Sequence, residues 1–302
     1  MALVNYDLNV PVPTEEDVDE TVKKVERLIR FGFSVIALNV NHSVSNKRKK
    51  PGKKNDSLQT EDDDNNKIAL CRRRLERIYQ NVNNVPNNFK ILSRVTVLLD
   101  NPDHVRCLQT DFIQSFDIIA IRPTNEKLFL QACTQIENID IISLDLDEKI
   151  PFRLKHSTVG AAVDRGICFE LSYASCIRST NLRQYVLANS LELVRKSHGK
   201  GIIFTSNAQH YMEIRGPQDI ANLGLLFGLR NDQASKAIRA TCKEVVVHAY
   251  ARAKTAKSVF CMRKTGEPST DLETIVRNEI ESTDTCNQVF HNEPSAKRAK
   301  KI

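Results

Sequence analysis

Short runs of apolar, often β-branched residues alternate along the chain with longer stretches in which apolar residues recur at helical spacing. The short runs are typical of buried strands, and the longer stretches are typical of amphipathic helices. Seven strands are predicted, over residues 3–9, 34–40, 91–99, 117–122, 139–146, 158–164 and 201–206. The position of an eighth strand is ambiguous. Because strands and helices alternate over this length, the pattern predicts an α/β protein.

Helices are predicted between these strands. The first begins at Thr14, which is a suitable N-cap residue, and Asp17 occupies the capping-box position. Its apolar face is formed by Val18, Val22, Val25, Leu28 and Ile29. Further helices are predicted over about 102–115, 125–136 and 180–197.

Two of the predicted strands carry polar residues on one face. The first places Asn5, Asp7 and Asn9 on one side, and the third places Arg94 and Thr96 on one side. A strand in an open parallel sheet is usually apolar on both faces, whereas a barrel can keep polar groups in its lumen. No GxGxxG or Walker loop follows a strand to favour a nucleotide-binding sheet. We therefore expect a TIM-barrel-like (β/α) barrel rather than an open doubly wound sheet.

The barrel is expected to occupy residues 1–260, with two segments outside it. Residues 43–66 form a polar insert, basic and then acidic, which is predicted to be disordered. Residues 261–302 are predicted to form a disordered basic tail. The chain has no run of eighteen apolar residues and no signal-peptide pattern at its start, so we expect neither a membrane span nor secretion.

The formal net charge of +7 is concentrated in two blocks. Residues 47–54 carry six positive charges and residues 297–301 carry four, so removing these ten leaves −3 for the rest of the chain. Such blocks are typical of nuclear import signals, and they predict a nuclear and nucleolar location; the alternative is nonspecific RNA tethering. The import candidates are Lys47, Arg48, Lys49, Lys50, Lys53, Lys54, Lys297, Arg298, Lys300 and Lys301.

Three carboxylates at predicted strand ends raise the alternative of a metal-dependent phosphoesterase. Asp7, Asp145 and Asp164 could together hold a divalent cation, because carboxylate oxygens are its natural ligands. The structural alternative is that Asp7 and Asp164 neutralise Arg94 and Arg165 in or near the lumen. We favour the structural alternative.

Other residue types that could support catalysis or disulfide bonding form no recognisable pattern. The seven histidines include no HxH or HExxH pair, and Ser206 has no GxSxG sequence around it. The eight cysteines include no CxxC pair, so we expect reduced, buried thiols. The sequence therefore predicts neither a metal site nor a cofactor.

Four segments resemble a known family. They are EIRGPQDIANLGLLFGL at 213–229, AVDRGICFEL at 162–171, FDIIAIRPTNEKLFLQAC at 116–133 and EKIPF at 148–152. The chain resembles the thirty-kilodalton-class protein subunit of nuclear ribonuclease P and RNase MRP, over about residues 1–260. The resemblance implies a TIM-barrel-like protein that is not an enzyme by itself.

The resemblance also implies a function and partners. The expected function is that of a non-catalytic scaffold in the RNA-based enzyme that removes the 5′ leader of precursor tRNA, with a related role in rRNA processing. The expected partners are other ribonuclease P and MRP protein subunits and the catalytic RNA, with precursor tRNA as a further candidate and no membrane. The fold is similar to that of barrel metallophosphoesterases with a DLHxH sequence after the first strand. Here Asn9 and Pro11 fill both histidine positions, which argues against the metal site.

Basic residues near strand ends and in loops are candidates for RNA contact. They are Arg94, Arg122, Lys127, Arg165 and Arg215, each of which could instead have a structural role. Segment 213–229 predicts a helix that begins at Gly216 and Pro217. Its apolar stripe could pack within the barrel or form a partner interface, for which the candidates are Ile220, Leu223, Gly224, Phe227 and Gly228.

Overall fold

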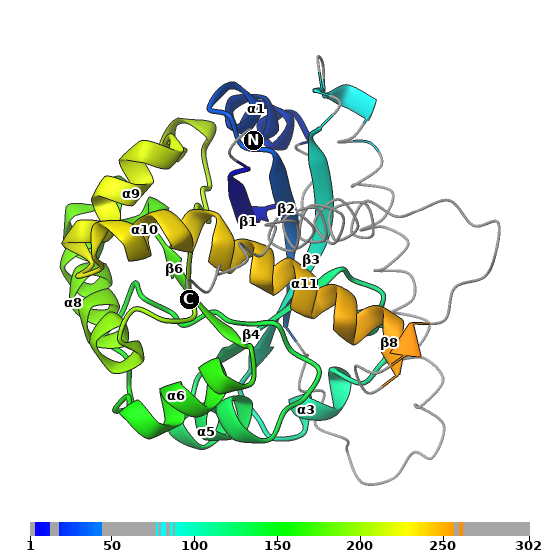
Figure 1. Ribbon diagram of the computed structural model, residues 1–302, viewed down its shortest axis with the longest axis vertical. Helices are drawn as coiled ribbons and strands as arrows, with labels where there is room; N and C mark the ends of the chain where they lie inside the picture. Colours follow the sequence, from blue (N-terminus) through cyan, green and yellow to red (C-terminus); the bar gives the residue numbers. More distant parts are fainter. Residues whose placement is uncertain are drawn as a thin grey trace, which may run out of the picture.

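Seven parallel strands and the helices between them form a nearly closed barrel (Figure 1). The computed structural model describes residues 4–12, 18–43, 77, 80–82, 85–86, 88–256 and 260–261. The strands of the barrel are β1 (Tyr6–Pro11), β2 (Val35–Ser43), β3 (Lys90–Leu99), β4 (Ile118–Pro123), β5 (Ile141–Ile142), β6 (Cys168–Ser172) and β7 (Ile202–Thr205). The strands follow one another around the barrel in sequence order, so the predicted (β/α) architecture is confirmed.

Helices connect successive strands on the outside of the barrel, and three more follow β7. Those that lie between strands are α1 (Val18–Arg30), α3 (His104–Cys107), α4 (Asp111–Gln114), α5 (Glu126–Thr134), α6 (His156–Asp164), α7 (Ala174–Arg178) and α8 (Thr180–Ser197). The elements after β7 are the 3-10 helix η1 (Tyr211–Glu213), α9 (Pro217–Leu226), α10 (Asn231–Ile238) and α11 (Ala240–Lys254), and then a small hairpin of β8 (Thr255–Ala256) and β9 (Phe260–Cys261).

One predicted strand is wrong, and one strand was missed. Residues 158–164 belong to α6, because Thr158, Val159 and Ala162 are buried together on one face of a helix. The strand follows it as β6, where the buried Glu170 interrupts an otherwise apolar run. The predicted helix over 102–115 is two short helices, whereas the helix predicted at 180–197 has those bounds in the structure.

The barrel closes where β7 meets β1. The Asn207 amide donates a hydrogen bond of 3.0 Å to the Asn9 carbonyl oxygen, and the Ser206 Oγ donates one of 3.2 Å to the same atom. Strand β1 also has a bulge, because its pairing with β2 shifts register between Asp7 and Val10. A bulge redirects the side chains that follow it, and here it turns Asn9 toward the lumen.

The side chains that face the lumen change character along the strands. Toward the amino ends they are apolar, and they pack as one cluster that includes Tyr6, Val35, Leu92, Ile118, Ile141, Cys168 and Ile203. Two residues later along several strands the same face becomes polar, at Asn39, Arg94, Ser143, Glu170 and Thr205. The lumen therefore has an apolar layer near the amino ends and a polar layer near the carboxyl ends.

Helix α11 lies across the amino end of the barrel (Figure 1). Its buried residues Cys242, Val245, Val246 and Ala249 belong to the apolar cluster of the lumen. The carboxylate of Asp140, which is completely buried, accepts a hydrogen bond of 2.8 Å from His248 Nδ1 if that nitrogen carries the proton, and it also pairs with Arg252. The helix thus closes one end of the barrel and is held there by a buried carboxylate.

Several predictions fall on other parts of the chain. Apart from Ser43, the last residue of β2, the predicted insert at 43–66 lies outside the described residues, as does the tail from residue 262. Among the described residues, the free cysteines Cys133, Cys168, Cys176 and Cys242 are buried as predicted, whereas the free Cys107 is only partly buried. None of the described helices combines the length and hydropathy needed to cross a membrane.

Candidate functional site

A buried ion pair occupies the carboxyl half of the lumen, the part of a barrel in which enzymes of this architecture place catalytic groups. Arg94 of β3 and Glu170 of β6 are 0% and 1% exposed, and their side chains bind in a bidentate arrangement. Nη1 lies 2.8 Å from Oε1, and Nη2 lies 2.6 Å from Oε2. Arg94 Nη1 also donates 2.7 Å to the carbonyl oxygen of Leu8 in the bulge of β1.

Polar side chains from three other strands, and Thr96 from β3 itself, complete this network. Asn9 Nδ2 donates to Glu170 Oε1 over 2.8 Å, and Thr205 Oγ1 donates to the same oxygen over 2.6 Å. Asn39 Nδ2 donates to Asn9 Oδ1, and Thr96 Oγ1 donates to Asn39 Oδ1, each over 2.8 Å. These groups bind mainly one another, and among the donors of the network Arg94 Nε is buried without a hydrogen-bond partner.

The electrostatics of two buried carboxylates on the strands, Glu170 in the lumen and Asp7 of β1, differ. Burial would raise the pKa of Glu170, but the charge of Arg94 and the hydrogen bonds that Glu170 accepts outweigh it and lower this pKa to about 2. Burial raises the pKa of Asp7 to about 6, although its Oδ1 accepts hydrogen bonds from the amides of Asn9 and Ser206. Glu170 is therefore held as a charged partner of Arg94, and Asp7 has no such cation.

The three carboxylates of the metal-site alternative do not converge. Asp7 is buried in β1, whereas Asp145 is exposed in the segment after β5. Asp164 is exposed at the end of α6, which precedes the amino end of β6 and so lies at the opposite end of the barrel from Asp145. In the part of the chain that the structure describes, no three His, Cys, Asp or Glu residues are grouped as metal ligands would be.

The predicted charge pairs are also wrong in detail. Arg94 pairs with Glu170 and not with Asp7. Arg165 donates hydrogen bonds to the backbone oxygens of Ala132, Cys133 and Ile136 at the end of α5, and not to Asp164. Both arginines are nevertheless bound to groups of the protein itself.

The candidates for RNA contact differ widely in accessibility. The structure contradicts the prediction for Arg94, because a side chain sealed in the lumen cannot reach an RNA phosphate. Arg122 is partly buried at the end of β4, and Arg215 is partly buried and donates 2.7 Å to the Met212 carbonyl oxygen. Lys127 is exposed on α5. None of the five lines any of the three surface hollows found in the described part of the chain.

The helix predicted from segment 213–229 is α9, and it begins at Pro217 as expected. Ile220 and Phe227 are buried, and Gly224 faces Phe204 and Ala234 closely enough that a Cβ atom would lie about 3 Å from each. These candidates for a partner interface are therefore packed inside the barrel domain. Leu223 is half-buried against the same core, and Gly228 is exposed after the helix end.

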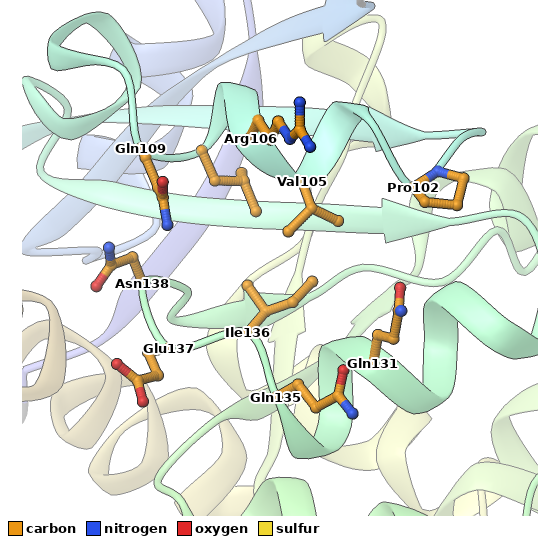
Figure 2. Close-up of a pocket in the computed structure, with 10 residues that line it drawn as sticks. Pro102, Val105, Arg106, Gln109, Gln131, Gln135, Ile136, Glu137 and Asn138 are labelled. Carbon is orange, nitrogen blue, oxygen red and sulfur yellow. The ribbon is translucent and has the colours of Figure 1, made fainter.

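Two hollows on the outer surface differ in chemistry. The first, shown in Figure 2, has a volume of about 390 Å³ and lies between α3 and the end of α5. Val105 and Ile136 face each other across it, and its rim contains amide side chains together with Arg106 and Glu137. The second hollow, of about 690 Å³, lies between the end of α8 and the start of α10 and is lined by Arg195, His198, Lys200 and Arg230.

Sequence reasoning missed Glu170 and this basic group. Glu170 could have been found from the alternation of Cys168, Glu170 and Ser172, which predicts one charged residue among apolar strand positions. The run from Arg195 to Lys200 is visible as a basic segment, but Arg230 is thirty residues away in sequence. Only the fold brings these residues to one hollow.

Comparison with known proteins agrees with this architecture. The family model described as RNase P subunit p30 matches residues 4–254. The chain is 35% identical over 247 residues to ribonuclease P protein subunit p30 of Mus musculus, covering 81% of this chain and 86% of that protein. It is 28% identical over 288 residues to ribonuclease P/MRP protein subunit RPP1 of Saccharomyces cerevisiae, covering 92% and 90%.

A solved structure supports the fold. A chain in the cryo-EM structure of archaeal ribonuclease P with mature tRNA matches with a TM-score of 0.57 and 15% sequence identity, covering 87% of this chain and 100% of that one. The family resemblance inferred from the four sequence segments is confirmed by the family model and by the relatives, which match most of the chain. The chain belongs to the RNase P subunit p30 family, the protein subunits of ribonuclease P.

Proposed function

We propose that the chain acts as a non-catalytic structural subunit of ribonuclease P, in which RNA cleaves the 5′ leader from precursor tRNA. The observation that carries the proposal is the family match over residues 4–254. The lumen supports it, because the carboxyl-end positions that a barrel enzyme uses for catalysis hold the mutually bonded Arg94–Glu170 network.

We extend the proposal to RNase MRP, which the name of the Saccharomyces cerevisiae relative includes, and with it to a related role in rRNA processing. The partners are then the other protein subunits and the RNA of these particles, with precursor tRNA as a further candidate. We also propose a nuclear and nucleolar location directed by the basic blocks at 47–54 and 297–301, which lie outside the described residues. Neutralising both blocks should move newly made protein to the cytoplasm, whereas neutralising one should not.

The direct test is depletion of the chain in its own cells, followed by measurement of precursor tRNA and of associated RNA. We expect precursors with uncleaved 5′ leaders to accumulate, and we expect the tagged chain to purify with ribonuclease P RNA and other subunits. Normal tRNA maturation after complete depletion, or purification without that RNA, would contradict the proposal.

Complementation separates this function from the phosphoesterase alternative. Asp145→Asn and Asp164→Asn change exposed carboxylates that contribute no buried ion pair, so both variants should fold and restore tRNA maturation fully. A metal-dependent phosphoesterase would lose its ligands in both variants. If either variant folds normally, enters the particle and yet fails to restore processing, the non-catalytic proposal is wrong.

A further inference from the structure

The second surface hollow is a concave basic site between α8 and α10, and we refer to it as the α8–α10 hollow. It is lined by Arg195 at the end of α8, by His198 and Lys200 in the turn that leads to β7, and by Arg230 before α10. All four side chains are exposed to solvent. Leu191 and Val194 contribute the apolar part of its lining.

The backbone around the α8–α10 hollow is fixed in an unusual conformation. His198 and Gly199 have φ values of 54° and 69°, and Gly228 on the other side has a φ of 88°. Gln233 joins the two sides, because its Nε2 donates 3.0 Å to the His198 carbonyl oxygen and its Oε1 accepts 3.1 Å from the Arg230 amide. The basic side chains therefore project from a preformed frame, which reduces the entropy lost when a ligand binds.

The charge at the α8–α10 hollow has one sign. No acidic side chain lines it among the residues that the structure describes, and the nearest recorded ion pair joins Arg230 to Asp232 over 3.6 Å. That pair is 76% and 58% exposed, so it is weak and leaves Arg230 able to bind other anions. By contrast, the hollow of Figure 2 combines Arg106 with Glu137.

We propose that the α8–α10 hollow binds the phosphate backbone of RNA. Exposed arginine and lysine side chains are the groups that contact phosphates, and arginine can bind phosphate oxygens through two parallel donors. Outside its two basic blocks the chain has a net charge of only −3, so this local concentration is not a consequence of a basic protein surface. The inference rests on the proposed function, since the RNA would be that of the ribonuclease P particle.

The test is a triple variant of the full chain, Arg195→Gln, Lys200→Gln and Arg230→Gln. Binding to a short RNA duplex is measured at several salt concentrations. Each lost phosphate contact should reduce the slope of log affinity against log salt by about 0.9, and therefore by up to about 2.7 for three contacts. We expect the affinity at low salt to fall by about tenfold or more, without a change in melting temperature.

A matched control changes three exposed basic residues elsewhere, Lys23→Gln, Arg30→Gln and Arg106→Gln. The control carries the same net charge as the triple variant, so a specific site requires a clearly larger loss in the triple variant. Equal losses in both, or no measurable binding by the unaltered chain, would overturn the proposal. A third outcome would also overturn it. If the triple variant keeps its RNA affinity but no longer purifies with a protein partner that the unaltered chain retains after ribonuclease treatment, the surface binds an acidic protein instead of RNA.

Crosslinking within the purified particle separates this proposal from the proposed function. A photoreactive residue placed at Lys200 should crosslink to ribonuclease P RNA, and the same residue placed at Lys23 should not. If the chain purifies with that RNA but Lys200 does not crosslink to it, this site is wrong while the subunit function stands. If the chain does not purify with the RNA at all, the proposed function itself has failed.

Discussion

Replacement of Glu170 by glutamine tests the role of the lumen ion pair. The variant keeps the size of the side chain but removes the charge that Arg94 needs, and it places an amide donor where Arg94 also donates. Both partners are at most 1% exposed, so water cannot replace the lost interaction. Breaking a buried pair in this way costs about 3–5 kcal/mol. At about 2–4 °C per kcal/mol for a domain of this size, the melting temperature should fall by roughly 6–20 °C.

The matched control is Glu126→Gln. Glu126 pairs with Lys155 over 3.3 Å, but the two side chains are 56% and 64% exposed. An exposed pair of this kind contributes at most about 1 kcal/mol, so its melting temperature should change by only a few degrees. Thermal and urea denaturation of the full chain, followed by circular dichroism, measures both variants. Equal changes in the two variants would refute the claim that the lumen pair stabilises the barrel.

The pH dependence gives a second measure of the same pair. The folded pKa of Glu170 is about 2, below its ordinary value of 4.5, so its stabilising contribution is fully present above pH 4.5. The contribution is lost as the pH falls toward 2. The difference in stability between the unaltered chain and Glu170→Gln should therefore shrink over that interval. A constant difference from pH 7 to pH 2 would show that ionisation of Glu170 is not its cause.

Three further changes test other parts of the barrel. Asp7→Asn should stabilise the chain above pH 6 by up to about 3 kcal/mol, because burial raises the pKa of Asp7 to about 6. The gain in stability should shrink as the pH falls toward 3.8, the ordinary pKa of an aspartate. A loss of stability at pH 8 would contradict this prediction. Gly224→Ala should destabilise the chain by about 1–3 kcal/mol in urea unfolding, because the new Cβ in α9 would lie 2.9 Å from that of Ala234. As a control, the Cβ of Gly160→Ala in α6 would meet no atom within 4 Å, so this variant should be more stable by up to about 1 kcal/mol. Asp140→Asn should lower the free energy of unfolding by about 3 kcal/mol, because Arg252 would lose its buried carboxylate partner. The backbone amides of α11 should then exchange hydrogen faster. Unchanged exchange would show that other contacts hold the helix in place.

The barrel could be predicted from sequence because its signal is local. Polar residues at every second position of β3 indicated a lumen, and the structure places Arg94 and Thr96 there. For β1 the predicted face was wrong, because Tyr6 and Leu8 line the lumen and Asn9 reaches it only through the bulge. The start of α9 at Pro217 could also be predicted, since proline suits the first position of a helix and fails in its interior. In β3 and at Pro217 the residue types determine the buried face or the backbone directly.

The partners of the buried charges could not be predicted in the same way. Arg94 and Glu170 are 76 residues apart in sequence, and Asp7 was a reasonable partner for Arg94 until the bulge in β1 and the closure of the barrel were known. The error at 158–164 has a related cause. A short apolar run of small residues fits a helix face and a strand equally well, and only its packing against neighbouring elements decides between them.

The polar groups at the two ends of the barrel differ in what they are free to bind. A catalytic centre needs polar groups that can exchange their partners for a substrate. At the carboxyl end of the lumen the Asn9, Arg94 and Glu170 side chains are buried and bonded to one another, so such an exchange would break a network worth several kcal/mol. In the α8–α10 hollow, Arg195, His198 and Lys200 lie before β7, near its amino end, and Arg230 lies before α10. Among the described residues none of these four pairs with a buried carboxylate. The proposed RNA site could therefore bind phosphates without breaking the buried network of the lumen.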